Sequence, residues 1–119
     1  MEKTKKFTEL IVWQKAHQFV LNVYKVTKSF PREEIFGLTS QLRRAAGSIP
    51  AKIAEGYKKR LKADKLRFLN ISETSLEEAK YHLILSNDLG YCLSSELLQK
   101  ADEVGILLNG YYRAIEKKP

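Results

Sequence analysis

The chain has 119 residues, a length typical of one domain with a single hydrophobic core, and its one cysteine excludes an internal disulfide and a cysteine-based zinc site within one chain. Apolar residues make up 44% of the sequence, and lysine and arginine outnumber aspartate and glutamate by 21 to 14. Charges interrupt every apolar stretch before it reaches the ~20 residues needed to cross a bilayer. We therefore expect one domain over residues 1–119, cytoplasmic and without a membrane partner.

The first apolar stripe with helical spacing runs from Trp13 to Thr27. Its members recur at steps of three and four residues and are Trp13, Ala16, Val20, Val23 or Tyr24, and Thr27. The segment Ser29, Phe30 and Pro31 follows directly and predicts the end of this helix.

The second stripe begins after Gly37 and contains an internal proline. Its members are Leu38, Leu42, Ala45, Ile49 and Ile53. Pro50 lacks the N–H group that would bond to the carbonyl of Ala46, and a proline inside a helix costs on the order of 3 kcal/mol. We expect this helix to be bent or broken near Pro50 and to end in a tight turn over residues 59–62.

The third and fourth stripes complete the fold. They comprise Leu69, Ser72, Leu76, Ala79 and Leu83, then Leu97, Ala101, Val104, Leu108, Tyr111 and Ile115. Gly90 predicts the end of the third helix, and Ser94 or Ser95 predicts the N-cap of the fourth. Because short connections make consecutive helices antiparallel neighbours, the sequence predicts an all-α, up-down-up-down four-helix bundle.

A second seam accompanies the core stripe of the second helix. It consists of Gly47, Pro50, Ala54 and Tyr57, spaced by three, four and three residues. Other apolar residues also lie away from the core stripes, namely Phe19, Val26, Ile71, Leu85 and Ile106. We interpret these residues as contacts between subunits of a homo-oligomer. The alternative is that single apolar side chains are scattered over any protein surface.

The basic residues are concentrated in one segment, from Arg43 to Arg67. Nine of them lie there with only Glu55 and Asp64, a surplus equal to the whole formal net charge of +7. The nine are Arg43, Arg44, Lys52, Lys58, Lys59, Arg60, Lys62, Lys65 and Arg67. A localised surplus of positive charge favours binding to a polyanion. We therefore predict that these residues bind the backbone of RNA or DNA with little base selectivity. The alternative is a solvated basic surface without a partner.

The position of these cations along the helices separates two groups. Residues 58–60 lie at the end of the second helix, where positive charge suits the helix dipole. Lys62, Lys65 and Arg67 lie near the start of the third helix, where the dipole disfavours positive charge. We therefore expect no local structural role for these three residues.

Catalytic and metal-binding patterns are missing from the sequence. Neither His17 nor His82 has a glutamate three residues before it, as a di-iron bundle requires. Glu78 and His82 are four residues apart and are predicted to share a hydrogen bond. We expect no enzymatic activity, no catalytic residue, no metal and no cofactor. A site formed between subunits is the remaining alternative for an enzyme.

The segment from Gln41 to Tyr57 reads QLRRAAGSIPAKIAEGY and resembles the hallmark of a bacterial four-helix-bundle family, the 23S ribosomal RNA intervening sequence proteins. Residues 7–16 resemble the family's opening, and residues 30–31 with 36–38 resemble its first interhelix connection. Residues 89–91 are similar to the end of its third helix. The resemblance covers nearly the whole chain.

This resemblance implies a bundle that assembles as a ring, commonly a homopentamer, with no enzymatic activity assigned. Related proteins are accessory subunits of diversity-generating retroelements, in which a basic pentameric barrel binds nucleic acid and a reverse transcriptase. The implied partners are further copies of the chain, RNA or DNA, and a reverse transcriptase or another protein.

Two positions depart from the family pattern. Lys52 stands where the family often has asparagine, and Gly47 replaces a usually larger residue. The motif residues Arg43, Arg44 and Glu55 have an alternative role in salt bridges inside or between subunits. Residues 58–67 are therefore the stronger candidates for nucleic-acid binding. The leading hypothesis is a non-enzymatic, homo-oligomeric nucleic-acid-binding scaffold, and the alternative is a protein-interaction scaffold with no nucleic-acid role.

Overall fold

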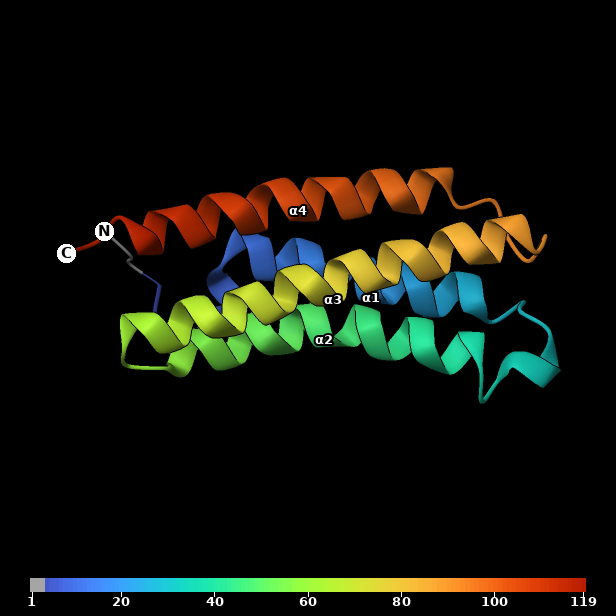
Figure 1. The fold of residues 1–119 in the computed structure, drawn as a ribbon, viewed down its shortest axis with the longest axis horizontal. Helices are drawn as coiled ribbons and strands as arrows, with labels where there is room; N and C mark the ends of the chain where they lie inside the picture. Colours follow the sequence, from blue (N-terminus) through green and yellow to red (C-terminus); the bar gives the residue numbers. More distant parts are fainter. Residues whose placement is uncertain (1–3) are drawn as a thin grey trace.

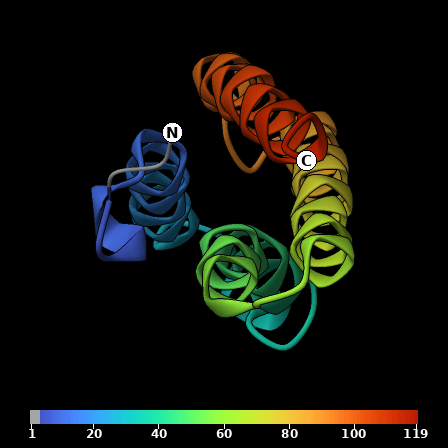
Figure 2. The same cartoon turned by 90° about the vertical axis from the view of Figure 1, so that its left-hand side faces the viewer.

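The computed structural model describes residues 4–119 and folds them into four long helices. The elements are η1 (Phe7–Glu9), α1 (Ile11–Thr27), η2 (Arg32–Glu34), α2 (Leu38–Lys58), α3 (Lys62–Asp88) and α4 (Ser95–Glu116). No strand occurs within this described range, which confirms the prediction of an all-α four-helix bundle. In Figure 1 the colour gradient reverses at each connection, so consecutive helices run in opposite directions. Seen along the bundle, the helices follow one another around a common centre (Figure 2).

The helix ends follow the residues that predicted them. Gly90 has a φ of +82°, a left-handed conformation that favours glycine. It allows the N–H of Tyr91 to donate to the carbonyl of Ser86 at 2.9 Å, which closes the end of α3. Gly37 immediately precedes α2, and Ser94 is the N-cap of α4 without a hydrogen bond from its side chain.

Helix α2 continues through Pro50. One helix is assigned from Leu38 to Lys58, so the break allowed for at this position does not occur, and a bend stays a prediction. The ring of Pro50 is buried, as is Ala46, whose carbonyl has lost its usual donor. Packing against the neighbouring helix therefore accommodates a residue that an isolated helix would disfavour.

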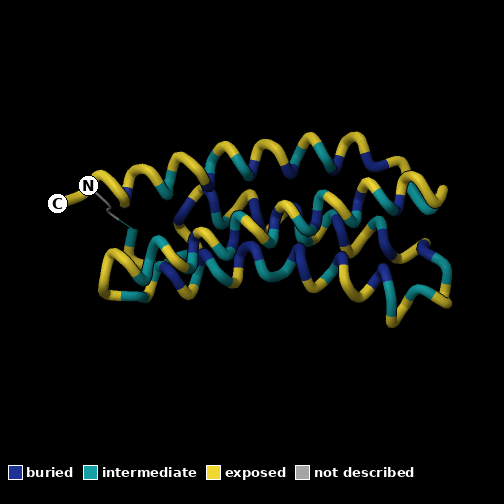
Figure 3. Tube along the Cα trace, viewed as in Figure 1, coloured by how far each residue is buried: buried dark blue, intermediate teal, exposed yellow. Residues whose placement is uncertain are grey.

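The core confirms the predicted stripes of α2, α3 and α4. All of their members are buried except Tyr111, which is half-buried. Figure 3 shows the buried positions recurring along each helix on the side that faces its neighbours. This shared apolar interior is the main source of the bundle's stability.

The predicted stripe of α1 is partly wrong. Ala16, Val23 and Thr27 are buried as expected, with Val23 and not its alternative Tyr24 in the core. Val12 and Phe19 complete the core in place of Trp13 and Val20. Both stripes fit a period of 3.6 residues because they share these three positions. The Trp13 ring lies at the edge of the core instead, in contact with Phe7 and His17. None of the helices between residues 4 and 119 has an apolar stretch long enough to span a bilayer.

Candidate nucleic-acid interface

The predicted basic surface is centred on the connection between α2 and α3. Lys58 is the last residue of α2 and Lys62 the first of α3, so three residues make the turn. This turn lies at the same end of the bundle as the end of α4 (Figure 1). The N-cap of α3 is Leu61, which has no polar side chain to cap the first N–H groups of the helix.

Four cations at this end, which we call the tip cations, have no acidic partner in the part of the chain that the structure describes. They are Lys58, Lys59, Arg60 and Arg67. Within residues 4–119, no carboxylate lies within ion-pair distance of any of them. Lys58, Arg60 and Arg67 are exposed and Lys59 is half-buried. Their charge is therefore available to an external anion.

Two of the tip cations lie against one aromatic ring, that of Phe68. The Nζ atom of Lys59 lies 4.8 Å and the guanidinium carbon of Arg67 lies 4.7 Å from the ring centroid of Phe68. Lys52 adds a third cation at 5.6 Å. Cation–π attraction holds the three charges near one another, and it occupies the ring that would otherwise stack on a base.

Lys65 and Lys62 have structural contacts that the sequence did not predict. The Nζ of Lys65 donates to the carbonyl of Tyr57 at 2.8 Å and is 3.4 Å from that of Gly56. These carbonyls belong to the last turn of α2, where a cation is favourable. The Nζ of Lys62 donates to the carbonyl of Lys118, beyond the end of α4. The expectation that these two residues have no local role was therefore wrong, because it considered only their own helix.

The three remaining basic candidates are engaged with other parts of the chain. Arg43 donates from Nε to Thr27 Oγ1 at 2.8 Å, and its guanidinium lies 4.5 Å from the ring centroid of Tyr24. Arg44 pairs with Glu78 of α3, which is the structural alternative considered for the motif. The ammonium of Lys52 lies 3.3 Å from a carboxylate oxygen of Glu55.

The predicted subunit contacts are only partly on the surface. Phe19 is 1% exposed and Pro50 is also buried, so both belong to the core of the protomer, which corrects their assignment to an interface. Ile106 is 74% exposed. The other predicted contacts are half-buried, namely Val26, Gly47, Ala54, Tyr57, Ile71 and Leu85. The hydroxyl of Tyr57 is used within the chain, where it donates to the carbonyl of Thr4 at 2.9 Å.

The predicted hydrogen bond between Glu78 and His82 is present, with 3.1 Å between Oε2 and Nε2. The Nδ1 atom of His82 is buried and has no hydrogen-bond partner in the described part of the chain. No group of three or more histidine, cysteine, aspartate or glutamate side chains there has the arrangement of a metal site.

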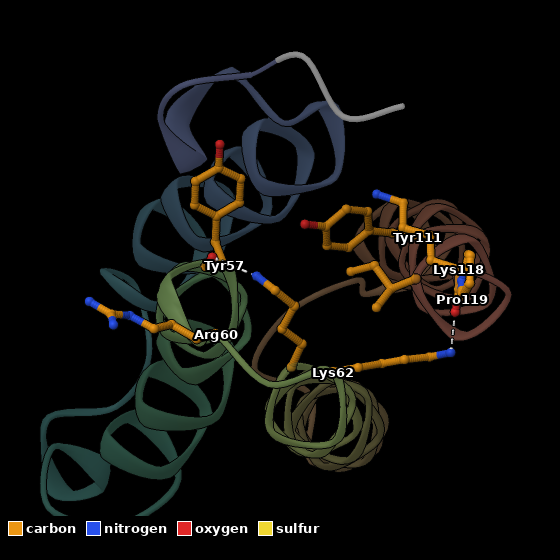
Figure 4. Close-up of a pocket in the computed structure, with 8 residues that line it drawn as sticks. Tyr57, Arg60, Lys62, Tyr111, Lys118 and Pro119 are labelled. Atoms are coloured by element: carbon orange, nitrogen blue, oxygen red, sulfur yellow. Dashed lines mark hydrogen bonds between the residues drawn. The ribbon is translucent and has the colours of Figure 1, made fainter.

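A cavity of about 440 Å³ lies beside the tip cations, and sequence reasoning missed it. Its lining comes from the end of α2, the turn, the start of α3 and the end of α4, and comprises Tyr57, Arg60, Lys62, Lys65, Tyr111, Ile115, Lys118 and Pro119. Figure 4 shows Tyr57 and Tyr111 on opposite sides of it. No local pattern in the sequence connects residues separated by some fifty positions.

Comparisons with known proteins agree with this architecture. The family model described as 23S rRNA-intervening sequence protein matches residues 8–110. The fold is similar to the crystal structure of a protein of unknown function from the S23 ribosomal protein family of Bacteroides thetaiotaomicron VPI-5482, with a TM-score of 0.79 and 24% identity. That match covers 87% of this chain and 96% of the other. No curated protein matches the chain.

Proposed function

The chain belongs to the 23S rRNA-intervening sequence protein family, and on that premise we propose that it is a non-enzymatic, homo-oligomeric accessory or scaffold protein that holds the backbone of RNA or DNA. The observation that carries this proposal is the absence of any carboxylate partner for the tip cations within residues 4–119. Four cations without an ion-pair partner among the described residues are not explained by pairing within the protomer, whereas binding to phosphate groups would explain them.

The binding mode follows from which groups are available. Cations on a convex hairpin contact phosphates in any sequence, because the phosphate backbone carries no base information. Phe68 is surrounded by cations, so its ring offers little free face for base stacking. We propose binding that depends strongly on salt and weakly on base sequence.

Self-association would multiply this charge. Ile106 on α4 is 74% exposed, and Tyr81 and Ile84 on α3 are 58% and 47% exposed, so apolar surface remains along two helices. Burying such surface between copies is favourable. A ring of five protomers would carry a formal charge of about +35, enough for a continuous phosphate-binding surface that an accessory protein offers to nucleic acid and to a reverse transcriptase or another protein.

The test compares two variants with the same change in net charge. In the first, Lys58, Lys59 and Arg60 are all replaced by Glu. In the second, the exposed cations Lys15, Lys25 and Lys28 on and after α1 are replaced by Glu. Fluorescence anisotropy with a 20-nucleotide single strand and with a duplex, across a salt series, measures affinity and its salt dependence.

We expect the tip variant to lose at least tenfold in affinity and the control to lose much less. Loss of three phosphate contacts should also reduce the slope of log K against log salt by about 2 for a single strand. Unchanged affinity in the tip variant, or equal losses in both variants, would contradict phosphate binding at the tip.

The oligomer is tested separately by light scattering. Replacing Ile106 with Glu places a charge in the proposed subunit contact and should reduce the measured mass toward that of the protomer. The matched control is Ile35→Glu, because Ile35 is 53% exposed and lies outside the proposed contacts. If the unaltered chain and both variants form oligomers of the same mass, the subunit contact lies elsewhere.

The second candidate is a protein-interaction scaffold with no nucleic-acid role. Two side chains favour it, since Phe36 is 93% exposed and Leu93 is 91% exposed. They lie in the α1–α2 and α3–α4 connections, at the end of the bundle opposite the tip (Figure 1). The decisive measurement is affinity for RNA and DNA at low salt. No binding by the unaltered chain would favour this candidate.

A further inference from the structure

The cavity beside the tip cations has the size and lining of a small-molecule site. Its volume of about 440 Å³ lies within the range of about 300–1,000 Å³ that is usual for ligand pockets. We propose that it binds one nucleoside monophosphate unit, either as a free nucleotide or as the phosphorylated end of a strand. This inference rests on the proposed function in so far as it takes a building block of nucleic acid as the ligand, and it adds a discrete site to the diffuse basic surface.

The apolar part of the cavity suits a base. Tyr57 and Tyr111 stand on opposite sides and come from different helices (Figure 4). The ring of Tyr57 is held in place because its hydroxyl donates to the carbonyl of Thr4 at 2.9 Å and lies 2.8 Å from Thr4 Oγ1. Ile115 adds an aliphatic surface. The ammonium of Lys65 lies 5.8 Å from the centroid of the Tyr57 ring, so a base that stacks in the cavity does so beside a cation. Aromatic faces stack on any base, so the site would select a base as a class and not one base in particular.

The polar part of the cavity suits a phosphate. Lys62, Lys65 and Lys118 line it, and no acidic side chain among the described residues does so. Hydrogen bonds to main-chain carbonyls position two of these lysines, with Lys62 bonded to residue 118 and Lys65 to residue 57. Arg60 also lines the cavity, but its guanidinium points away from the other side chains in Figure 4. A ligand with a flat ring and a phosphate matches both parts of this lining.

The first experiment asks whether both parts of the ligand are needed. Titration calorimetry compares adenosine 5′-monophosphate with adenosine and with inorganic phosphate. We expect the nucleotide to bind at least tenfold more tightly than either fragment. If inorganic phosphate binds as tightly as the nucleotide, or if the nucleotide does not bind at millimolar concentration, the inference is overturned.

The second experiment places the ligand in the cavity through two adjacent lysines. Lys118 lines the cavity, whereas Lys117 is exposed and does not. Because one charge-assisted phosphate contact is lost, Lys118→Gln should weaken nucleotide binding by about tenfold, and Lys117→Gln by less than twofold. Equal losses would mean attraction by net charge and would overturn the site.

The stacking surface is tested at Tyr111. Tyr111→Phe keeps the ring and should keep the affinity, whereas Tyr111→Leu should lose about tenfold because it removes the stacking face. Thermal unfolding shows whether the Leu variant is folded at the temperature of the titration. If the Leu variant is unfolded, the inference is judged from Tyr111→Phe and from the comparison of Lys118→Gln with Lys117→Gln. A Phe variant that loses as much as the Lys118 variant would contradict stacking on this ring.

Strands separate this inference from the proposed function. A ten-nucleotide strand with a 5′-phosphate is compared with the same strand with a 5′-hydroxyl. Preference for the phosphorylated strand, removed by Lys118→Gln, identifies a strand end as the ligand. Nucleotide binding without such a preference identifies a free nucleotide. If strands bind with no end preference and the nucleotide does not bind, the cavity inference fails alone. If the nucleotide binds and no strand does, the proposed function fails alone.

Discussion

The hydroxyl of Ser72 donates a hydrogen bond of 2.9 Å to the main-chain carbonyl of Ile49, the residue before Pro50. Both residues are fully buried, so this bond joins α3 to α2 inside the core. It lies one residue from the position where proline removes a donor from the α2 ladder. A polar contact between helices thus supports the segment whose own helical hydrogen bonding is weakest.

Replacing Ser72 with Ala tests this contact. The variant should lose about 1 kcal/mol in the free energy of unfolding, the usual net contribution of one such bond, as measured by urea denaturation. The control is Thr74→Ala, whose hydroxyl bonds to Ile71 on the exposed side of the same helix at 2.9 Å. That change should stay within about 0.5 kcal/mol. Equal effects would show that the buried bond adds nothing specific.

Two glycines of α2 should respond in opposite ways to alanine. A Cβ at Gly47 would have nothing within 4 Å in the protomer, so Gly47→Ala should stabilise by about 0.5–1 kcal/mol through helix propensity. A Cβ at Gly56 would lie 3.2 Å from the Cβ of Phe68 and 3.5 Å from the carbonyl of Lys65. Both obstacles are fixed to the α3 backbone, so Gly56→Ala should destabilise because the helices must separate. Thermal unfolding of the two variants gives the comparison, and a stabilised Gly56 variant would contradict it.

The fold was largely predictable because its signals are local. Apolar periodicity located the core of α2, α3 and α4, and Gly37, Gly90 and Ser94 marked helix ends within a residue or two. The error in α1 had a physical cause. Trp13 and Phe19 are both large and apolar, and each is three residues from the buried Ala16. Only packing against the other helices decides which of them faces inward.

The site was less predictable because its roles depend on contacts across the fold. The sequence located the surplus of cations. It could not tell that Arg43 and Arg44 join helices while Lys58 and Arg60 have no ion-pair partner within residues 4–119. Helix-dipole reasoning at Lys65 used the start of α3, whereas its amine contacts the end of α2. Long-range packing, which no local pattern encodes, separates structural cations from available ones.

The hydrogen bonds of Glu34 should make the free energy of unfolding depend on pH. Its carboxylate accepts hydrogen bonds from the N–H of Leu38 at 3.0 Å and from the hydroxyl of Tyr91 at 2.9 Å, and these hold the pKa of Glu34 below its ordinary value of 4.5. A carboxyl with a depressed pKa adds stability above its unfolded pKa, and that stability is lost as pH falls through the folded pKa. Glu34→Gln should therefore be less stable than the unaltered chain at neutral pH, and the difference should disappear as pH falls below the folded pKa of Glu34, which lies under 4.5.

Urea unfolding across that pH range measures the difference. The control is Glu33→Gln, which removes the neighbouring carboxylate, for which residues 4–119 offer no hydrogen bond or ion pair. Its stability should follow that of the unaltered chain at every pH. A constant deficit in the Glu34 variant, independent of pH, would mean that the ionised form is not what stabilises the fold.

Lys65 should stabilise the protein through the end of α2. Lys65→Met keeps the aliphatic stem and removes the ammonium group that donates to the carbonyl of Tyr57 at 2.8 Å. We expect a loss of about 0.5–1 kcal/mol in unfolding free energy, as is usual for a cation at a helix C-terminus. Lys15→Met on the exposed side of α1 is the control and should have little effect. If both variants are equally stable, the contact of Lys65 with the end of α2 has no structural role.

Phe68 should position the cations that we propose bind nucleic acid. Phe68→Leu removes the ring that lies within 6 Å of Lys52, Lys59 and Arg67 but leaves every charge in place. Side chains freed from the ring must be ordered when they bind phosphate, so affinity for a single strand should fall by about two- to fivefold. The salt slope should not change, because the number of phosphate contacts is the same. Phe68→Tyr keeps the ring and serves as the control. An unchanged affinity in the Leu variant would show that the ring does not position these charges. A reduced slope of log K against log salt would show that a phosphate contact is lost with the ring.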